Sequence, residues 1–230
     1  MKNFKIFWRQ FATLGGYENF LTGLKNTAFI AVFGLVLGLV IGCIVATVKI
    51  IPKNNALMKF LKGFGNVYVT VFRGTPMVVQ LLLLHFALFP LFGINIGDVS
   101  EAAVIFGLNS GAYMTETLRA GINSVDKGQM EAGRSLGLSF GATMMKIILP
   151  QAVKNILPNI GNEFISLIKE TSVVSFIAVT DITKSFRVIA ESTYEFFVPY
   201  IMLAIVYLVL VIGITALIRL LERRFAKNER

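Results

Sequence analysis

The sequence predicts an all-α integral membrane protein with five membrane-spanning helices. Of its 230 residues, 55% are hydrophobic and 15% are charged, whereas soluble domains carry about 25% charged residues. The mean hydropathy is +0.72, and several apolar runs approach the roughly 20 residues that a helix needs to cross a bilayer. The single cysteine, Cys43, excludes an intramolecular disulfide and a cysteine-based zinc site.

The N-terminal segment, residues 1–20, mixes aromatic residues such as Phe4 and Trp8 with basic residues such as Lys5 and Arg9. Aromatic and basic side chains together are typical of a segment that lies in the membrane interface. The apolar run that follows is too long for the core of a signal peptide, so we expect it to be retained as the first span.

The first span is predicted at about 22–48, the start of a membrane domain covering 21–221. It contains Gly34, Gly38 and Gly42 at four-residue spacing. Because small residues let helix backbones approach closely in a membrane, this stripe predicts tight packing by a neighbouring helix.

Residues 57–72 carry apolar side chains with a period near 3.6, and lysines begin on the other side of the helix. This pattern predicts an amphipathic helix that lies along the cytoplasmic surface. Gly74 breaks the helix, and Pro76 suits the first position of a new one. The second span is therefore predicted at about 76–92.

The remaining spans are predicted at about 99–119, 155–179 and 197–221, joined by a loop at 122–153 and by a mixed-charge loop at 181–196. The span at 99–119 is short and polar, with Asn109 in its middle, so we expect it inside the bundle. A basic tail, residues 222–230, closes the chain.

Lys and Arg set the orientation, because cytoplasmic segments carry an excess of them. The segments 49–73, 119–154 and 219–230 hold five each, so 15 of the 22 lie there. This distribution places the N-terminus outside and the loop 122–153 and C-terminus in the cytoplasm of a cell-membrane protein. It also explains the net charge of +9 without nucleic acid as a partner.

The cytoplasmic loop carries the most informative motif: Glu-Ala-Gly-Arg-Ser-Leu-Gly at 131–137, nine residues, then Ile-Ile-Leu-Pro at 147–150. Asp126 can cap a helix here, and Gly137 can end that helix or allow a tight turn into another that starts near Ser139. Two short helices that meet at a glycine form a rigid knob.

This motif resembles the EAA loop of ATP-binding-cassette (ABC) importer permeases, the segment on which the ATPase subunit docks. The resemblance rests on Glu131, Ala132, Gly137, Ile147, Leu149 and Pro150. Gly133 departs from the family pattern, which usually has a second alanine. The resemblance implies that Glu131, Ala132 and Gly137 sit in a cleft of the ATPase and pass its closure to the spans.

The sequence contains no G-x-x-x-x-G-K-[ST] phosphate-binding loop. We therefore expect no enzymatic activity and no cofactor in this chain. ATP and magnesium would be bound by two copies of a separate ATPase subunit.

A second motif, Phe-Arg-Gly-Thr-Pro at 72–76 with Gln80, resembles the permeases that import polar amino acids (histidine, arginine, glutamine, glutamate, opines and cystine). The segments 109–113, 119–122, 149–152 and 161–164 agree with it. Arg73, Gly74, Thr75, Pro76 and Gln80 are candidates for a gating or structural role.

Candidate substrate ligands lie in the fourth predicted span. Glu163 and Glu170 are seven residues apart and fall within about 20° on a helix. Asn159 and Ser166 share their side, and Asn109 of the third span is a candidate partner. Carboxylates can bind an α-ammonium or cationic group through charge-assisted hydrogen bonds, although Glu170 could instead pair with a nearby basic residue or lie near the outer exit.

These carboxylates favour arginine, histidine or glutamine as substrate, while cystine and acidic amino acids stay open. We expect His85 to be packed or hydrogen-bonded, and Glu116 and Arg119 to form a salt bridge.

The resemblance implies the small version of the type I ABC importer permease fold, paired as a homodimer or a heterodimer in membrane lipid. An extracellular or periplasmic binding protein would deliver the amino acid. An ion-coupled secondary transporter is the alternative, but such proteins usually show inverted repeats with interrupted helices, and no such pair is evident. A membrane enzyme is disfavoured by the presence of one His and one Cys.

Overall fold

The computed structural model describes residues 2–52 and 55–227, and these ranges contain helices and no strand. The α-helices are α1 (Lys2–Thr13), α2 (Gly16–Ile50), α3 (Ala56–Gly74), α4 (Met77–Leu83), α5 (Phe89–Leu91), α6 (Asp98–Asn123), α7 (Lys127–Ser135), α8 (Phe140–Thr143), α9 (Leu149–Glu170), α10 (Ile182–Thr193) and α11 (Phe197–Lys227). Two π-helical turns, η1 (Leu84–Leu88) and η2 (Met144–Ile148), and a 3₁₀ helix, η3 (Thr171–Ile177), complete the described chain. The predicted all-α class is confirmed.

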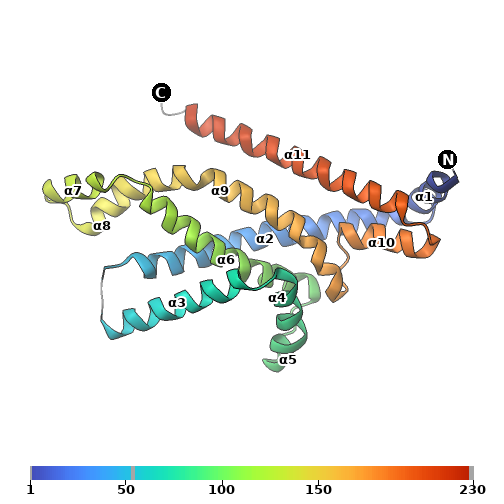
Figure 1. Cartoon of the computed structure of the whole chain (residues 1–230), viewed down its shortest axis with the longest axis horizontal. Coiled ribbons are helices and arrows are strands. Elements are labelled where there is room, and N and C mark those ends of the chain that lie inside the picture. Colours follow the sequence, from blue (N-terminus) through green and yellow to red (C-terminus); the bar gives the residue numbers. More distant parts are fainter. Residues whose placement is uncertain (1, 53–54, 228–230) are drawn as a thin grey trace.

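Helices α2, α3, α6, α9 and α11 run along the long axis of the molecule (Figure 1). Helices α7 and α8 lie at one end, and α1 and α10 lie at the other end beside the N-terminus. Helices α2 and α11 are each long and apolar enough to cross a membrane, and α3 with α4–α5 passes the same test as a bent pair.

The centre of the bundle is the contact between α2 and α6, which depends on glycine. A Cβ added to Gly38 of α2 would lie 2.6 Å from Ser110 Oγ, and one added to Gly42 would lie 2.5 Å from Met114 Cβ. Helix α6 reciprocates, because a Cβ on its Gly107 would lie 2.5 Å from a side chain of α2. The predicted close packing at the glycine stripe is confirmed, and the partner helix is α6.

Helix α6 is buried by its neighbours through most of its length, as expected for the short polar span. Fully buried side chains line it, among them Ala102, Ala103, Ile105, Phe106 and Ala112. Ala102, Ala103, Ile105 and Phe106 form one apolar core with residues of α2, α4, α9 and η3.

The second crossing differs from the prediction. Residues 57–72 do not lie apart on the cytoplasmic surface, since α3 packs against α2 and α6 and runs lengthwise beside them. After Gly74 the chain turns by 111° into α4. The segment that passes the test for a span as a bent pair therefore includes α3, and the predicted span at 76–92 covers only its second part.

The direction of the amphipathic face explains this error. The large apolar side chains of α3 point away from the chain, with Phe60 70% and Phe64 67% exposed. Its buried positions are Gly65 and Val69. The apolar stripe predicts a helix lying along the cytoplasmic surface, whereas in the structure the stripe is the outward side of a helix that packs in the bundle through Gly65 and Val69.

The segment 181–196, predicted as a loop, contains α10. The Asp181 side chain caps this helix by accepting hydrogen bonds from the backbone N–H groups of Thr183 and Lys184 at 2.9 and 2.8 Å. Because the Asp181 carboxyl is buried, its pKa is raised above its ordinary value. Phe186 of α10 stacks on Phe7 of α1 with ring centroids 6.2 Å apart, so the N-terminal segment is folded onto α10.

The ends of the last two predicted spans also shift. Helix α9 ends at Glu170 and the chain continues as η3, while α11 reaches Lys227, five residues past the beginning of the predicted tail at 222. The last tail residues, 228–230, lie outside the described part of the chain.

Candidate functional site

The loop between α6 and α9 folds into the knob that its sequence predicts. The Asp126 carboxylate accepts a hydrogen bond from Gly128 N–H at 2.6 Å and caps α7. Gly137 has φ 81° and ends α7, with its N–H donating to Arg134 O and the next N–H, of Leu138, donating to Gly133 O. This pair of bonds is a Schellman motif, which needs a residue in the left-handed region and therefore favours glycine. The Ser139 side chain then caps α8 by accepting from Ala142 N–H at 3.2 Å.

The structure explains why the motif has glycine at position 133. Gly133 is buried against Thr143, and an added Cβ would lie 2.5 Å from Thr143 Cγ2 and 2.8 Å from its Oγ1. Thr143 is itself fully buried, so it cannot easily move aside. The departure from the family pattern thus allows α7 and α8 to lie in close contact.

The knob presents a mixed surface to solvent. Glu131 and Ala132 are exposed on α7. Two large apolar residues that sequence reasoning missed are more exposed still, with Leu136 at 81% and Met145 at 68%. The position of Leu136 directly before the predicted helix-ending glycine was the available signal for it.

The Ile-Ile-Leu-Pro run holds the knob to the bundle. Ile147 and Leu149 are partly buried, and Pro150 lies exposed in the first turn of α9. The buried residue of this run is Ile148, which packs with Val125. A hollow of about 530 Å³ lies beside this contact, lined by residues of the knob and of the ends of α2 and α6.

The second motif fixes the bend between α3 and α4. The Gln80 side chain folds back, and its Nε2 donates to Phe72 O at 2.7 Å and to Thr75 O at 2.9 Å. These carbonyl groups lie at the end of α3, where intrahelical donors run out. The motif residues next to them are Gly74, where an added Cβ would meet nothing within 4 Å, and Pro76, which begins α4.

Helix α6 completes this network through Asn109, whose Nδ2 donates to Gln80 Oε1 at 2.8 Å. Asn109 and Gln80 are 4% and 6% exposed, so solvent has almost no access to the network. Arg73 is exposed, and its guanidinium lies 5.4 Å from the ring centroid of Tyr113 on α6. Of the predicted site residues, Asn109 is therefore joined to the Arg-Gly-Thr-Pro bend.

The four polar residues of α9 lie on one helix and are not covered by the chain. Asn159 and Glu170 are exposed, and Glu163 and Ser166 are partly exposed, whereas the buried residues of α9 are apolar ones such as Leu167. Ser110 of α6 lies beside Glu163. Its Oγ is buried and has no hydrogen-bond partner of ordinary geometry among the described residues.

Two clusters of polar side chains match the expectations for His85 and Glu116. His85 Nδ1 lies 2.7 Å from Glu101 Oε2. Glu116 accepts from Arg119 at 2.6 Å and also from Lys49 of α2 at 2.8 Å. The lysine was not anticipated, because only the structure brings α2 and α6 together.

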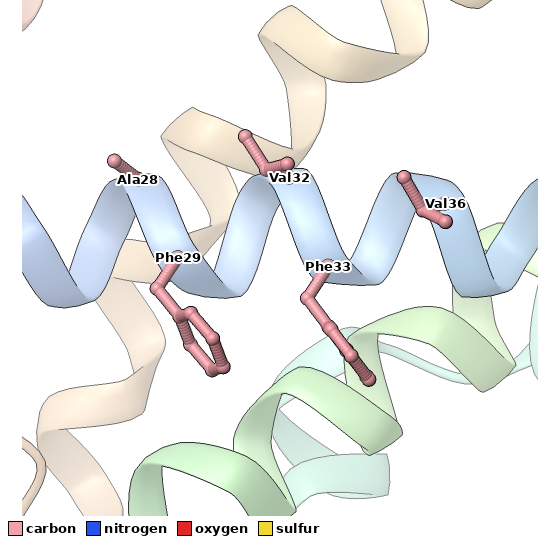
Figure 2. Close-up of a pocket in the computed structure, with 5 residues that line it drawn as sticks. All are labelled: Ala28, Phe29, Val32, Phe33 and Val36. Atoms are coloured by element: carbon pink, nitrogen blue, oxygen red, sulfur yellow. The ribbon is translucent and has the colours of Figure 1, made fainter.

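A second hollow, on α2, is shallow and apolar (Figure 2), and Ala28, Phe29, Val32, Phe33 and Val36 line it. All five belong to one helix. It is a strip of apolar surface suited to contact with lipid chains, and within residues 2–52 and 55–227 its lining is these five apolar side chains.

Comparison with known proteins gives concordant matches. Residues 38–227 match the family model described as binding-protein-dependent transport system inner membrane component. A putative glutamine transport system permease protein of Rickettsia bellii is 42% identical over 207 residues, which cover 90% of this chain and 91% of that protein. The arginine transport system permease protein ArtQ of Bacillus subtilis is 38% identical, covering 95% and 97%. The solved structure of an amino acid ABC transporter with histidines matches with a TM-score of 0.81 and 39% identity, covering 90% of this chain and 94% of that one.

Proposed function

This chain belongs to the binding-protein-dependent transport system inner membrane components, and we propose that it is the permease subunit of an ATP-driven importer of polar amino acids. Its relatives include permeases named for glutamine, arginine and cystine transport. Within this range we favour a cationic or amide-bearing substrate such as arginine, histidine or glutamine. Cystine and acidic amino acids are the alternatives.

The observation that carries the proposal is the exposed knob of α7 and α8. Large apolar side chains that are exposed at the end of a rigid, capped unit mark a surface for a protein partner. Leu136 and Met145 have this character, and Glu131 and Ala132 flank them on the knob. We infer that an ATPase subunit docks here, with two copies serving two permease subunits and holding the ATP and magnesium.

The uncovered polar face of α9 supports a paired permease. A carboxylate that faces lipid is costly, so Glu163 needs a protein or water-filled surrounding. The chain itself leaves this residue partly exposed. A second permease subunit, identical or homologous, would cover the face and enclose the pathway between the two.

In this arrangement Glu163 contacts the ammonium or cationic group of the substrate, with Asn159, Ser166 and Glu170 along the same face. Ser110 of α6 lies beside Glu163 with its hydroxyl buried, so it can position the carboxyl but not contact the substrate. Asn109 acts through the bend at Gln80 rather than as a direct ligand. The bend at Gly74–Pro76 is then the natural hinge, with Arg73 and Thr75 beside it.

We assign the knob and the C-terminus to the cytoplasm and the N-terminus to the outside. The end formed by α1 and α10 would then meet the substrate-binding protein. ATP binding would close the ATPase pair and draw the knobs together, opening the pathway outward, and hydrolysis would reset it.

Uptake by proteoliposomes tests the proposal. The chain is reconstituted with its ATPase and binding protein, and labelled arginine is competed with unlabelled histidine, glutamine, glutamate and cystine. ATP-dependent arginine uptake that histidine blocks supports the cationic assignment. Uptake blocked only by glutamine or cystine keeps the importer and moves Glu163 to a structural role.

Two comparisons make this experiment decisive. Glu131→Ala should abolish uptake, whereas Glu191→Ala, which changes an exposed carboxylate on α10, should preserve it. If no amino acid is taken up in the presence of ATP, the proposed substrate class is refuted.

A further inference from the structure

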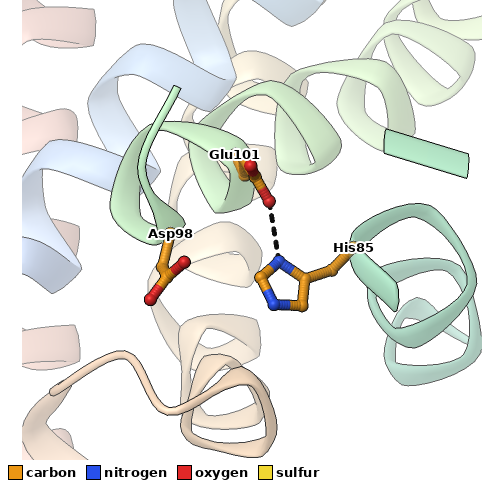
Figure 3. A group of neighbouring side chains, drawn as sticks. All are labelled: His85, Asp98 and Glu101. Atoms are coloured by element: carbon orange, nitrogen blue, oxygen red, sulfur yellow. Dashed lines mark hydrogen bonds and ion pairs between the residues drawn. The ribbon is translucent and has the colours of Figure 1, made fainter. Parts of the chain in front are cut away.

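A cluster of three potential metal ligands lies outside the knob and outside the polar face of α9. It consists of His85 on η1 and of Asp98 and Glu101 in the first turns of α6. One ligand atom from each residue lies within 4.8 Å of the others. Figure 3 shows the imidazole and the two carboxyl groups at the corners of a triangle, with one ring nitrogen directed at Glu101.

The burial of the cluster is graded from the inside to the surface. The Glu101 side chain is 7% exposed and the His85 side chain 15% exposed, while Asp98 is exposed. A buried carboxylate is costly unless it is paired. Glu101 and His85 are therefore held within the bundle, and the exposed Asp98 marks the side from which an ion can enter.

Helix N-terminal preference does not account for this arrangement. Acidic residues are favourable in the first turn of a helix, which is sufficient for Asp98. It does not explain why Glu101 is buried with its Oε2 2.7 Å from an imidazole nitrogen of another element. That element is a π-helical turn, a feature that is frequent at functional sites.

We propose that His85, Asp98 and Glu101 form a binding site for a first-row divalent cation such as Zn²⁺. One imidazole nitrogen and two carboxylate oxygens are ligands that zinc accepts, at about 2.0–2.2 Å from the ion. The ion would replace the hydrogen bond between His85 Nδ1 and Glu101 Oε2, which would have to move apart from 2.7 Å to admit it, and the exposed Asp98 would supply the third ligand. Water completes the coordination.

Charge favours a cation at this site. The site contains two carboxylates and one imidazole. Among the described residues, no lysine or arginine forms an ion pair with Asp98 or Glu101. A bound ion would join η1 to α6. It would therefore hold the arm formed by α4, η1 and α5 against the bundle, close to the connection at residues 92–97.

Calorimetric titration with Zn²⁺ of the full chain in detergent, purified without a polyhistidine tag and treated with chelator, tests the site. We expect one Zn²⁺ per chain and a rise in the thermal midpoint of unfolding, because a ligand that binds the folded state stabilises it. Cobalt(II) reports the coordination by its visible absorption, and Mg²⁺ should not compete.

Variants distinguish metal binding by His85 from its hydrogen bond to Glu101. His85→Asn retains a donor that can reach Glu101 but removes the imidazole, so its midpoint without metal should stay near the parent's while affinity falls by at least about tenfold. Asp98→Asn should weaken binding similarly, and Glu191→Gln should not. Absence of Zn²⁺ binding by the parent would overturn the proposal. So would binding by His85→Asn and Asp98→Asn that is as tight as the parent's, because it would indicate adventitious binding to other carboxylates.

Discussion

Helices α6 and α9 pack against each other, and both carry polar side chains through the bundle. In α6, Asn109 donates to Gln80 and Thr115 to the carbonyl of Gly111, and both residues are buried. In α9, the side chains of Glu163 and Ser166 stay partly exposed. The difference shows two kinds of polar residue in a membrane chain: those buried with hydrogen-bond partners within the chain and those left partly exposed. Asn109 and Thr115 of α6 stabilise the fold, whereas Glu163 and Ser166 of α9 are left accessible to a second molecule.

The largest effect on stability is expected from a substitution that separates α6 from α2. Gly38→Leu places atoms where a Cβ alone would lie 2.6 Å from Ser110 Oγ and 2.7 Å from Ser110 Cβ. We expect a loss of about 3 kcal/mol or more, since overpacking a tight contact forces the helices apart. The thermal midpoint of the purified chain measures it.

Gly213→Leu is the matched control, because a Cβ on this α11 glycine meets nothing within 4 Å. Equal midpoints for the two leucine variants would show that the contact between α2 and α6 does not limit stability.

The next effect concerns the hydrogen bonds of α6. Gln80→Ala removes the donor to Phe72 O and Thr75 O and the acceptor of Asn109. Because buried polar groups then lack partners, we expect a loss of about 2 kcal/mol. Gln151→Ala, an exposed glutamine bonded within its own helix turn, should cost less than about 0.5 kcal/mol in the same unfolding assay. A similar cost for both would mean that the bend is held by other contacts.

Glu163→Gln should change transport and leave stability unchanged, the opposite of the two variants above. We expect its thermal midpoint to equal the parent's, while ATP-driven arginine uptake falls about tenfold, equivalent to about 1.4 kcal/mol. The amide keeps the size of the side chain and loses the charge that would bind a cationic group. Lower stability with unchanged transport kinetics per folded molecule would assign Glu163 to structure, as with the polar residues of α6.

The smallest effect is expected in the knob that connects α6 to α9. Gly137→Ala forces a non-glycine residue into φ 81°, which costs about 1 kcal/mol. Gly137→Asn should cost less, because asparagine tolerates this region better. The ATPase activity stimulated by the permease reports the change. Equal activity of the alanine and asparagine variants would show that the conformation at 137 does not govern coupling.

The sequence was sufficient where local chemistry decides the structure. The cap at Asp126, the helix end at Gly137 and the glycine contacts of the first span follow from the properties of single residues. It was insufficient where packing direction decides. The apolar stripe of α3 faces outward and α10 is held by Phe7 and Phe186, both of which depend on segments far apart in sequence.

The same limit applies to the candidate sites. Asn109 was a reasonable ligand candidate by composition, yet it bonds to a glutamine 29 residues earlier in the chain. Glu101 carried no sequence signal, since an acidic residue near a helix start is common. Leu136 and Met145 were missed because exposure is a property of the folded knob.

The connection between α6 and α7 is short, so a movement of the knob is passed directly to α6. Only Ser124, Val125 and Asp126 separate the two helices. Helix α6 has 26 residues and is therefore about 39 Å long. A tilt of about 6° about its end at the knob would displace its opposite end by about 4 Å, by the same geometry. Since α6 packs closely against α2 at glycines, both helices would swing together, and a small push at the knob would become a larger movement at the opposite end of α6.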